Sequence, residues 1–441
     1  MTKLEQTFSK KYDYQDLIET GTMLEDALWQ DEDVIAFGGD GRFNNHFYES
    51  QNGGKKLTWG YGFHVNAVEW ATDSHVPTAN PNLYNYPRAM RYFALGFTES
   101  DPDERRKYQA KMLVSLGHLM HLVNDMNVPA HVRDDPHPFN EPLEVWMRGG
   151  WDGDNTNMGF HVMGNVIEGN IPKTMGTIYR QSTVADFMKS EAEFTSENFV
   201  SKDTLHLDSN SYLPNGSTIS YSPSYDIGNG VKKRYIKNRY GTKIAMEIES
   251  HICNNIQKIY YPNEPSRRGI GLCGAPTTIK GDYTVLEDSG KVLIKRAVSN
   301  ATGFVDYFFR GQISAKIDGR NITIKNISDP SLVKDKHTVT IHPGTFHLKY
   351  TTRYDDTLRD FEFTRDMDRY EPNIEQVGGG IRRIGGFASL ITLEPGDSIV
   401  VAIKRDTSIL GKNIVVLYEG FIGSERGFAV CTADKPSAMA N

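Results

Sequence analysis

The spacing of apolar side chains between residues 101 and 127 predicts a long helix. Apolar residues recur there at helical intervals, at Tyr108, Met112, Leu116, Leu119, Met120 and Val123. Asp101 is a suitable N-cap, Pro102 fits the first helical position, and Glu104 stands where a capping box would place it. Pro129 disfavours helix at the residue before it, so we expect the helix to end shortly before this proline.

Similar patterns predict helices elsewhere in the first two thirds of the chain. The expected ranges are 13–29, 85–97, 185–198, 242–260 and about 288–310, the last closing at Gly311. Residues 203–235 are rich in Ser, Asn, Gly and Tyr, which is typical of a long irregular segment. This part of the chain is therefore expected to be mainly helical.

After Gly311 the pattern changes to a two-residue period. "QISAKIDGRNITIKNI" alternates on both sides of Asp318-Gly319, which predicts a hairpin, and three later stretches continue the alternation between Gly and Pro turns. The fold class expected is an α+β multidomain protein, in which an all-α domain (1–311) is followed by an all-β sandwich (312–441). Two domains suit a chain of 441 residues.

The amino-acid composition argues against two classes of protein. A hydrophobic content of 38% with 11% aromatic residues is enough for packed cores and argues against wholesale disorder. The formal charge of -7 argues against a protein that coats nucleic acid through a basic surface. It does not argue against an enzyme that captures phosphate through bound cations, because the metal supplies positive charge locally.

The cysteines and the apolar stretches of the sequence give little information about function. Three cysteines make neither a disulfide framework nor a zinc cluster of the Cys type, although the sequence allows one Cys253–Cys273 bridge. The first sixteen residues contain no apolar core of a signal peptide, and no stretch approaches the length of about 18 apolar residues that a spanning helix needs. We expect a soluble chain whose abrupt start reflects truncation or processing.

Candidate metal ligands are concentrated in "HLMHLVNDMNVPAHVRDDPH", residues 118–137, which holds four of the thirteen histidines. His121 and Asp125 are four residues apart and share one face of the predicted helix. His131 follows the helix stop, where the chain can turn back toward that face. Imidazole nitrogen and carboxylate oxygen are ligands that zinc accepts. A histidine with an aspartate four residues later occurs by chance in many helices, but the added Pro129 and His131 favour a metal site.

Beyond His121, Asp125 and His131, the sequence offers two further candidate ligands and several histidines that we do not interpret as ligands. His137 and Glu144, in "DDPHPFNEPLEVWM", extend the supply of ligands downstream. His118 lies one turn before His121, and we interpret it as a neighbour of the ligands or a surface residue. The three histidines of the β region are interpreted as surface residues: His337, His342 and His347.

These residues resemble the zinc-dependent phospholipase C and single-strand nuclease superfamily, in particular a bacterial subgroup with an added C-terminal β domain. The "HxxxD…PxH" signature of that superfamily stands here as His121, Asp125, Pro129 and His131. "NNHFYES" (44–50) is similar to its "HFYDP" segment, "YNYPRAMRYFALGF" (84–97) to the helix before the metal helix, and "FVDYFFRG" (304–311) to the end of the helical domain. The resemblance covers roughly residues 20–311.

The resemblance implies up to three clustered zinc ions in an all-helical domain. The implied ligands are His46, His121, Asp125, His131, His137 and Glu144, with Asp125 bridging two metals. An aspartate upstream of His46 would serve as ligand or general base. Asp26 is the first choice for that role, and the alternatives are Glu25, Asp33 and Asp40.

The chain also departs from the superfamily pattern. Members usually have a histidine followed four residues later by Glu or Asp at the third site, where this chain offers His137 with Glu141 or Glu144, or else Glu193 and Glu197 without a histidine. Glu49 replaces the usual aspartate of "HFYDP". Members also use an amino-terminal tryptophan and an early histidine as ligands, and neither precedes His46. Either the natural first helix is missing or one metal site is lost.

The function implied is phospholipase C-like hydrolysis of a phosphodiester by a metal-activated water. A phospholipid substrate and peripheral membrane contact are favoured, without a stable nucleic-acid complex, and the resemblance implies a secreted or periplasmic protein. The alternatives are a single-strand nuclease and a non-catalytic binding protein that has lost part of the cluster. Seven aromatic residues could line a substrate site or pack in the core: Phe47, Tyr48, Trp70, Tyr84, Tyr86, Trp146 and Trp151.

Overall fold

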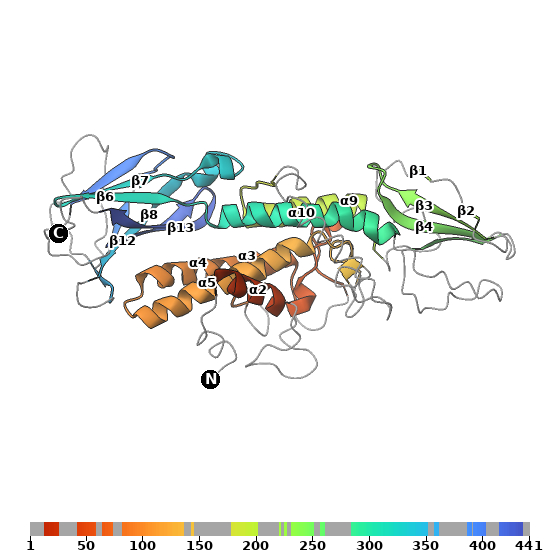
Figure 1. The fold of residues 1–441 in the computed structure, drawn as a ribbon, viewed down its shortest axis with the longest axis horizontal. Coiled ribbons are helices and arrows are strands. Elements are labelled where there is room, and N and C mark those ends of the chain that lie inside the picture. Colours follow the sequence, from red (N-terminus) through yellow and green to blue (C-terminus); the bar gives the residue numbers. More distant parts are fainter. Residues whose placement is uncertain are drawn as a thin grey trace.

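The protein is an α+β protein in which helices occupy the middle and β-sheets the two ends (Figure 1). The computed structural model describes residues 13–25, 42–58, 64–73, 82–135, 143–144, 178–201, 220–221, 225–226, 231–250, 256–260, 284–351, 357–360, 386–389, 391–402 and 414–434. The helices form two layers, with α9 and α10 lying over α2, α3, α4 and α5 (Figure 1). The expected α+β class is confirmed.

Five of the six predicted helices are present in the described residues. Their bounds are α2 (Tyr14–Glu25), α4 (Tyr86–Thr98), α5 (Pro102–Asp125), α9 (Val184–Asn198) and α10 (Thr284–Phe308); short helices are α3 (Ala67–Thr72), η1 (Arg42–Asn45), η2 (Ser50–Asn52), η4 (Pro330–Leu332) and η5 (His337–Val339). Local chemistry sets their starts: Asp101 caps α5 by accepting from the amides of Asp103 and Glu104, as predicted. Residues 26–29 of the first predicted helix lie outside the described residues.

The helix predicted over 242–260 is wrong. Strands β4 (Lys243–Ser250) and β5 (Ile256–Tyr260) occupy this range, and β4 pairs antiparallel with β3 (Val231–Lys237). With β1 (Ser220–Tyr221) and β2 (Tyr225–Asp226) they form a five-stranded antiparallel sheet. The region before residue 311 is therefore not all-helical, and the last part of the segment expected to be irregular is strand.

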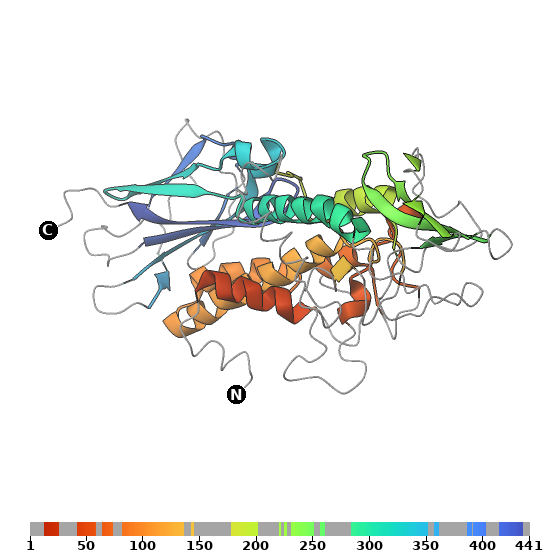
Figure 2. The ribbon, with the colours of Figure 1, turned by 45° about the vertical axis from the view of Figure 1, so that its right-hand side comes forward.

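The C-terminal strands form one mixed sheet. Its strands are β6 (Ile313–Asp318), β7 (Asn321–Asn326), β8 (Ile341–Tyr350), β9 (Arg359–Asp360), β10 (Gly386–Ser389), β11 (Ser398–Ala402), β12 (Ile414–Ile422) and β13 (Glu425–Asp434), in the order β10-β8-β12-β13-β6-β7-β11 with β9 on β8. The hairpin at Asp318-Gly319 is confirmed, and Gly319 adopts a φ of 56° that favours glycine. The sequence predicted two separate facing sheets, whereas the parallel pair Ala433↔Ala315 joins the two parts into one curled sheet (Figure 2).

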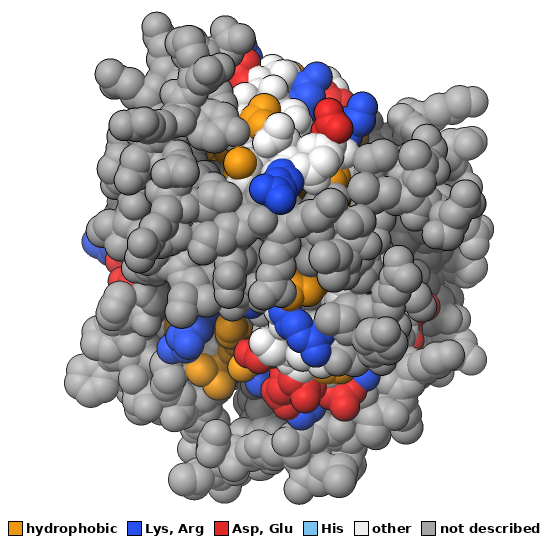
Figure 3. Space-filling model, turned by 90° about the vertical axis from the view of Figure 1, so that its left-hand side faces the viewer, with side chains coloured by type: hydrophobic (Ala, Val, Ile, Leu, Met, Phe, Trp, Pro, Cys, Tyr) orange, Lys and Arg blue, Asp and Glu red, His pale blue; other side chains and the backbone are white. Residues whose placement is uncertain are grey.

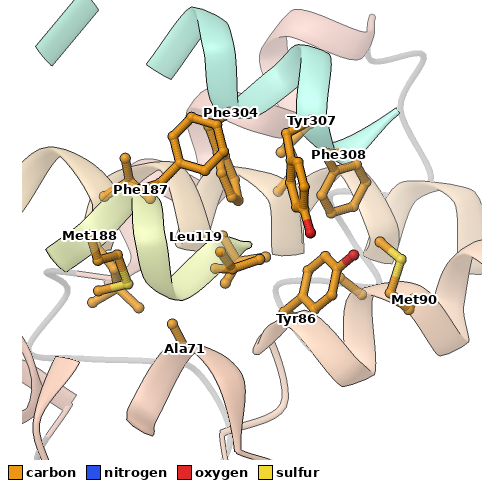
Figure 4. Close-up of a cluster of buried hydrophobic side chains, with 14 of the residues drawn as sticks. Ala71, Tyr86, Met90, Leu119, Phe187, Met188, Phe304, Tyr307 and Phe308 are labelled. Atoms are coloured by element: carbon orange, nitrogen blue, oxygen red, sulfur yellow. The ribbon is translucent and has the colours of Figure 1, made fainter. Parts of the chain in front are cut away.

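An apolar core fills the space between the helical layers. Phe187 of α9 and Phe304 of α10 meet edge to face, and Tyr307 and Phe308 of α10 face Tyr86 of α4 (Figure 4). The hairpin of β12 and β13 contributes to this same core through two further buried residues, Leu417 and Phe428. The division at 311/312 stays a prediction, but side chains from both sides of it share one core.

Polar contacts also link the end of α10 to the β12–β13 hairpin and to α4. Arg310, buried at the end of α10, donates to the Ile422 carbonyl at 2.9 Å and to the Tyr86 hydroxyl at 3.0 Å. The Tyr307 hydroxyl donates to Glu425 Oε2 at 2.6 Å. Because buried donors are costly when they lack partners, the helices and the hairpin depend on each other.

The surface at the end of the molecule that holds the C-terminal sheet carries both signs of charge. In the first two turns of α5, Arg106 pairs with Asp103, and Lys107 Nζ lies 2.7 Å from Glu104 Oε1. Figure 3 shows acidic and basic side chains intermixed on this face. Within the described residues, no helix combines the length and the hydropathy that crossing a bilayer requires.

Candidate metal centre

Three separate segments bring candidate ligands to the end of α5. His46 follows η1, His121 and Asp125 occupy the last turn of α5, and Glu144 stands in the short described piece 143–144. One nitrogen or oxygen from each of His46, His121 and Asp125 lies within 4.8 Å of the others, and the same holds for Asp125, His131 and Glu144. These two groups of residues can hold metal ions, and they share Asp125.

The distances from Asp125 to His46 and His121 suit coordination of a common ion. Asp125 Oδ2 lies 3.1 Å from His46 Nδ1, and Asp125 Oδ1 lies 3.4 Å from His121 Nε2 and 3.5 Å from His131 Nδ1. His131 Nε2 lies 3.6 Å from Glu144 Oε1, so His131 presents one ring nitrogen to Asp125 and the other to Glu144, and a single ion binds through only one of them. Ligands about 2.0–2.1 Å from a tetrahedral zinc stand about 3.3 Å apart, so these spacings fit the donor set.

Backbone hydrogen bonds hold the ligand segments in place. After α5 ends, the Val128 amide donates to the Asp125 carbonyl at 2.9 Å, and the chain turns so that His131 follows within one turn. The Tyr48 amide then donates to the His131 carbonyl at 2.9 Å, which ties the segment carrying His46 to the turn carrying His131. The ring of Phe47 packs on His131 with centroids 4.9 Å apart.

Glu25, the last residue of α2, lies beside His46 and away from the shared carboxylate. It is fully buried and accepts hydrogen bonds from Trp70 Nε1 at 3.0 Å, from Arg42 and from His118 Nδ1. Its Oε1 lies 3.4 Å from His46 Nε2. His46 thus presents Nδ1 to Asp125 and Nε2 to Glu25. Metal-ligating imidazoles commonly donate their second nitrogen to a carboxylate, and Glu25 holds that position.

Charges around Glu25 are balanced. Burial alone would raise its pKa, but the Arg42 guanidinium and His118 hold it well below its usual value. Burial lowers the pKa of His118 to about 4, so this ring is neutral near pH 7 and donates through Nδ1. Glu25 is therefore a carboxylate paired chiefly with Arg42.

The shared carboxylate of Asp125 is surrounded by histidines, whereas Glu25 pairs with an arginine. Burial would raise the pKa of Asp125, but His121, His131 and His46 lower it well below its usual value. Burial would lower the pKa of His46, whereas Asp125 and Glu25 raise it to about 10. Positive charge is therefore strongly favoured at this point, and a bound cation can supply it in place of the proton.

Two glycines allow α2 to reach this position. A Cβ atom on Gly21 would lie 2.0 Å from the Val114 carbonyl oxygen, and one on Gly117 would lie 2.0 Å from the Ile18 carbonyl oxygen. Thr22 Oγ1 also donates to the Gly117 carbonyl at 3.3 Å. The backbones of α2 and α5 therefore touch, which brings Glu25 next to α5.

A cavity of about 800 Å³ lies between α5 and α10 and reaches the ligand residues. Its wall on α10 is mainly apolar and consists of Leu293, Ile294, Ala297, Val298, Ala301, Thr302, Val305 and Asp306. Polar groups gather at the α5 side: His121, Asn124, Asp125, Asn127 and Glu144. The cavity therefore joins an apolar wall to the candidate metal centre.

The structure brings together five of the predicted ligands and leaves others outside. Those brought together are His46, His121, Asp125, His131 and Glu144. Asp26, His137, Asp33, Asp40, Glu141, Trp146 and Trp151 lie outside the described residues, as do Cys253 and Cys273. Glu193 and Glu197 are exposed on α9 and belong to neither ligand group, and Glu197 lies 3.5 Å from Arg239.

Two residues beside the ligands, His118 and Glu25, hold more central positions than the sequence indicates. His118 is a buried neighbour of the ligands, as one of its two interpretations held. Glu25 was only an alternative to Asp26, although it continues the buried stripe of α2 through Leu17 and Gly21 at four-residue spacing. A carboxylate in an apolar stripe indicates a buried partner, which here is Arg42, a residue without any sequence signal of its own.

Comparisons with protein-family models, curated proteins and solved structures gave no match for this chain. The resemblance to the zinc-dependent phospholipase C and nuclease superfamily therefore rests on the motifs quoted above.

Proposed function

We propose that the protein is a zinc-dependent phosphodiester hydrolase of the phospholipase C type. The observation that carries this proposal is the pair of largely buried ligand groups that share Asp125 beside a cavity with an apolar wall. Histidine nitrogens and carboxylate oxygens are the ligands that zinc accepts. The proposal includes up to three zinc ions, a phospholipase C-like helical domain and the C-terminal β region as an accessory domain.

The chemistry would divide between the metal and the protein. Bound zinc lowers the pKa of water toward about 7 and stabilises charge on phosphoryl oxygens. Asp125 would hold both ligand groups together, and Glu25 would orient His46. Because Glu25 already accepts hydrogen bonds from Trp70, Arg42 and His118, it is poorly available as the base that takes a proton from water. Asp26 stays the proposed base.

The cavity wall favours a phospholipid over a nucleic acid. Burial of aliphatic chain is worth about 0.8 kcal/mol per methylene, and the α10 wall offers aliphatic contacts for it. Base stacking would need broad aromatic rings, and no Phe, Tyr or Trp lines the cavity among the described residues. Trp70 and Tyr86 are buried in the core, and Tyr84 stacks on His118 at 4.1 Å. Peripheral membrane contact and export from the cell belong to the same proposal.

Zinc content and hydrolysis test the proposal together. We expect two or three zinc ions per chain by elemental analysis and zinc-stimulated hydrolysis of bis(p-nitrophenyl) phosphate. Asp125→Asn should greatly reduce both. The control is Asp103→Asn on the same helix, whose side chain is 73% exposed and should leave both unchanged.

Three outcomes would change the assignment. Full activity in excess chelator refutes metal-dependent hydrolysis. Zinc without turnover indicates a non-catalytic binding protein. If single-stranded DNA is cleaved faster than a choline phospholipid, the nuclease alternative replaces the phospholipase.

A further inference from the structure

Asn127 is a buried amide whose side chain makes no hydrogen bond to the part of the chain that the structure describes. It lies in the turn after α5, its exposed fraction is 3%, and it lines the cavity beside the candidate ligands. Its backbone amide donates to the Asn124 carbonyl at 2.8 Å, but neither Nδ2 nor Oδ1 has a hydrogen-bond partner among the described residues. Buried polar groups are normally satisfied, so this amide requires an explanation.

The position of Asn127 indicates what would satisfy it. It follows Asp125 by two residues and precedes His131 by four, so it stands between members of the two ligand groups. The neighbouring Asn124 also lines the cavity, and its buried Oδ1 accepts no hydrogen bond from the described residues. An amide offers donors without a negative charge, which suits an anion close to carboxylates.

We propose that Asn127 binds a phosphate group, with Nδ2 donating to a non-bridging oxygen of the substrate or of the phosphomonoester product. This inference rests on the proposed function, because it takes the cavity as the substrate site. Cations held by the neighbouring ligand groups would neutralise the same phosphate, and Asn127 would fix its orientation. A hydrogen bond to a charged oxygen is stronger than one between neutral groups.

An ordered water molecule is the competing occupant of this position. Water satisfies many buried polar groups and is costly to remove. The two occupants differ in their consequences. A phosphate partner makes Asn127 important for anion binding and unimportant for the stability of the free protein, whereas a structural water makes it important for stability alone.

The test compares Asn127→Ala with Asn198→Ala in the zinc-loaded protein. Asn198 is also fully buried, but its Nδ2 donates to the Phe194 carbonyl at 2.7 Å and it does not line the cavity. Inorganic phosphate is titrated by calorimetry, and Tm is measured without phosphate. Asn127→Ala should weaken phosphate binding about tenfold or more with unchanged zinc content and little change in Tm. Asn198→Ala should lower Tm and keep the phosphate Kd.

A third variant distinguishes loss of the hydrogen-bond donor from loss of side-chain volume. Asn127→Asp keeps the size of the side chain but replaces the donor with a carboxylate, so phosphate binding should weaken further than in Asn127→Ala. An unchanged phosphate Kd in Asn127→Ala, or a fall in Tm as large as that of Asn198→Ala with no change in Kd, overturns the proposal. So does a wild-type protein that binds no phosphate.

The same measurements distinguish failure of this inference from failure of the proposed function. If the wild-type protein holds zinc and cleaves the diester but Asn127→Ala binds phosphate normally, only the Asn127 assignment fails. If the wild-type protein holds no zinc or has no turnover, the proposed function fails. Phosphate is then titrated into the protein as isolated, and a tenfold loss in Asn127→Ala still supports the amide as an anion contact.

Discussion

Replacing Glu25 by alanine should strongly destabilise the metal-free protein. The carboxylate is fully buried and pairs with Arg42, whose side chain is itself only 4% exposed. Removing one member of a buried ion pair leaves the other charge without compensation, which costs about 3–5 kcal/mol. The hydrogen bond from Trp70 Nε1 adds about 1 kcal/mol. Since such losses are not additive, we expect about 4 kcal/mol in all.

Thermal unfolding in a chelator measures this loss. Taking about 2.1 cal/mol/K per residue, unfolding of the whole chain as one unit carries about 0.9 kcal/mol/K, so about 4 kcal/mol lowers Tm by about 4 °C. Glu19→Ala on the exposed side of α2 is the control and should change stability by less than about 0.5 kcal/mol. Denaturant unfolding gives an independent measure of the same free energy.

Two further measurements sharpen the prediction. Adding Arg42→Met to Glu25→Ala should restore part of the lost stability, because both buried charges are then absent. Zinc affinity should fall about 10–100-fold in Glu25→Ala, because His46 loses the carboxylate that orients its ring. A Tm within 1 °C of the wild-type value together with normal zinc affinity would refute the placement of Glu25.

Three shorter predictions concern packing, pH and the C-terminal region. Gly117→Ala should lower both Tm and zinc content, because its Cβ would meet the Ile18 carbonyl and push α2 away from α5; unchanged values contradict the close approach. In the metal-free protein the pKa of His46 is raised to about 10, so its contribution to stability is complete below about pH 6.5 and is lost as pH rises toward 10. Tm should therefore fall over this range in chelator, while zinc affinity rises because binding displaces the proton; a flat Tm profile contradicts the pairing with Asp125. Truncation after residue 311 should give insoluble protein in expression trials, because Arg310 loses the Ile422 carbonyl and the core loses Phe428; a folded monomer on gel filtration would show independent domains.

Local features of the chain were readable from the sequence. The cap at Asp101, the period along α5 and the Asp318-Gly319 turn depend on neighbouring residues, and all were predicted. The four-residue spacing of His121 and Asp125 likewise places both side chains on one helical face without knowledge of any other segment.

Where the spacing of apolar residues fits both a helix and a strand, the pairing between strands decided the structure. In the range 242–260, Ile248, Ile252 and Ile256 fit a helix, whereas Ile244, Met246 and Ile248 fit a strand. The antiparallel pairing of β4 with β3 and β5 made this segment a sheet. Short apolar runs carry no information about partners far along the chain, so periodicity alone could not choose.

The tertiary structure alone decided how the candidate site is built. Glu25, Arg42 and His118 are separated by up to 93 positions and meet only because Gly21 and Gly117 let two helices touch. The unsatisfied amide of Asn127 and the apolar wall of α10 likewise appear only when the cavity is formed. The sequence by itself determined the short-range elements and the ligand types on α5. Packing determined their partners, because burial and charge pairing depend on which segments lie together in space.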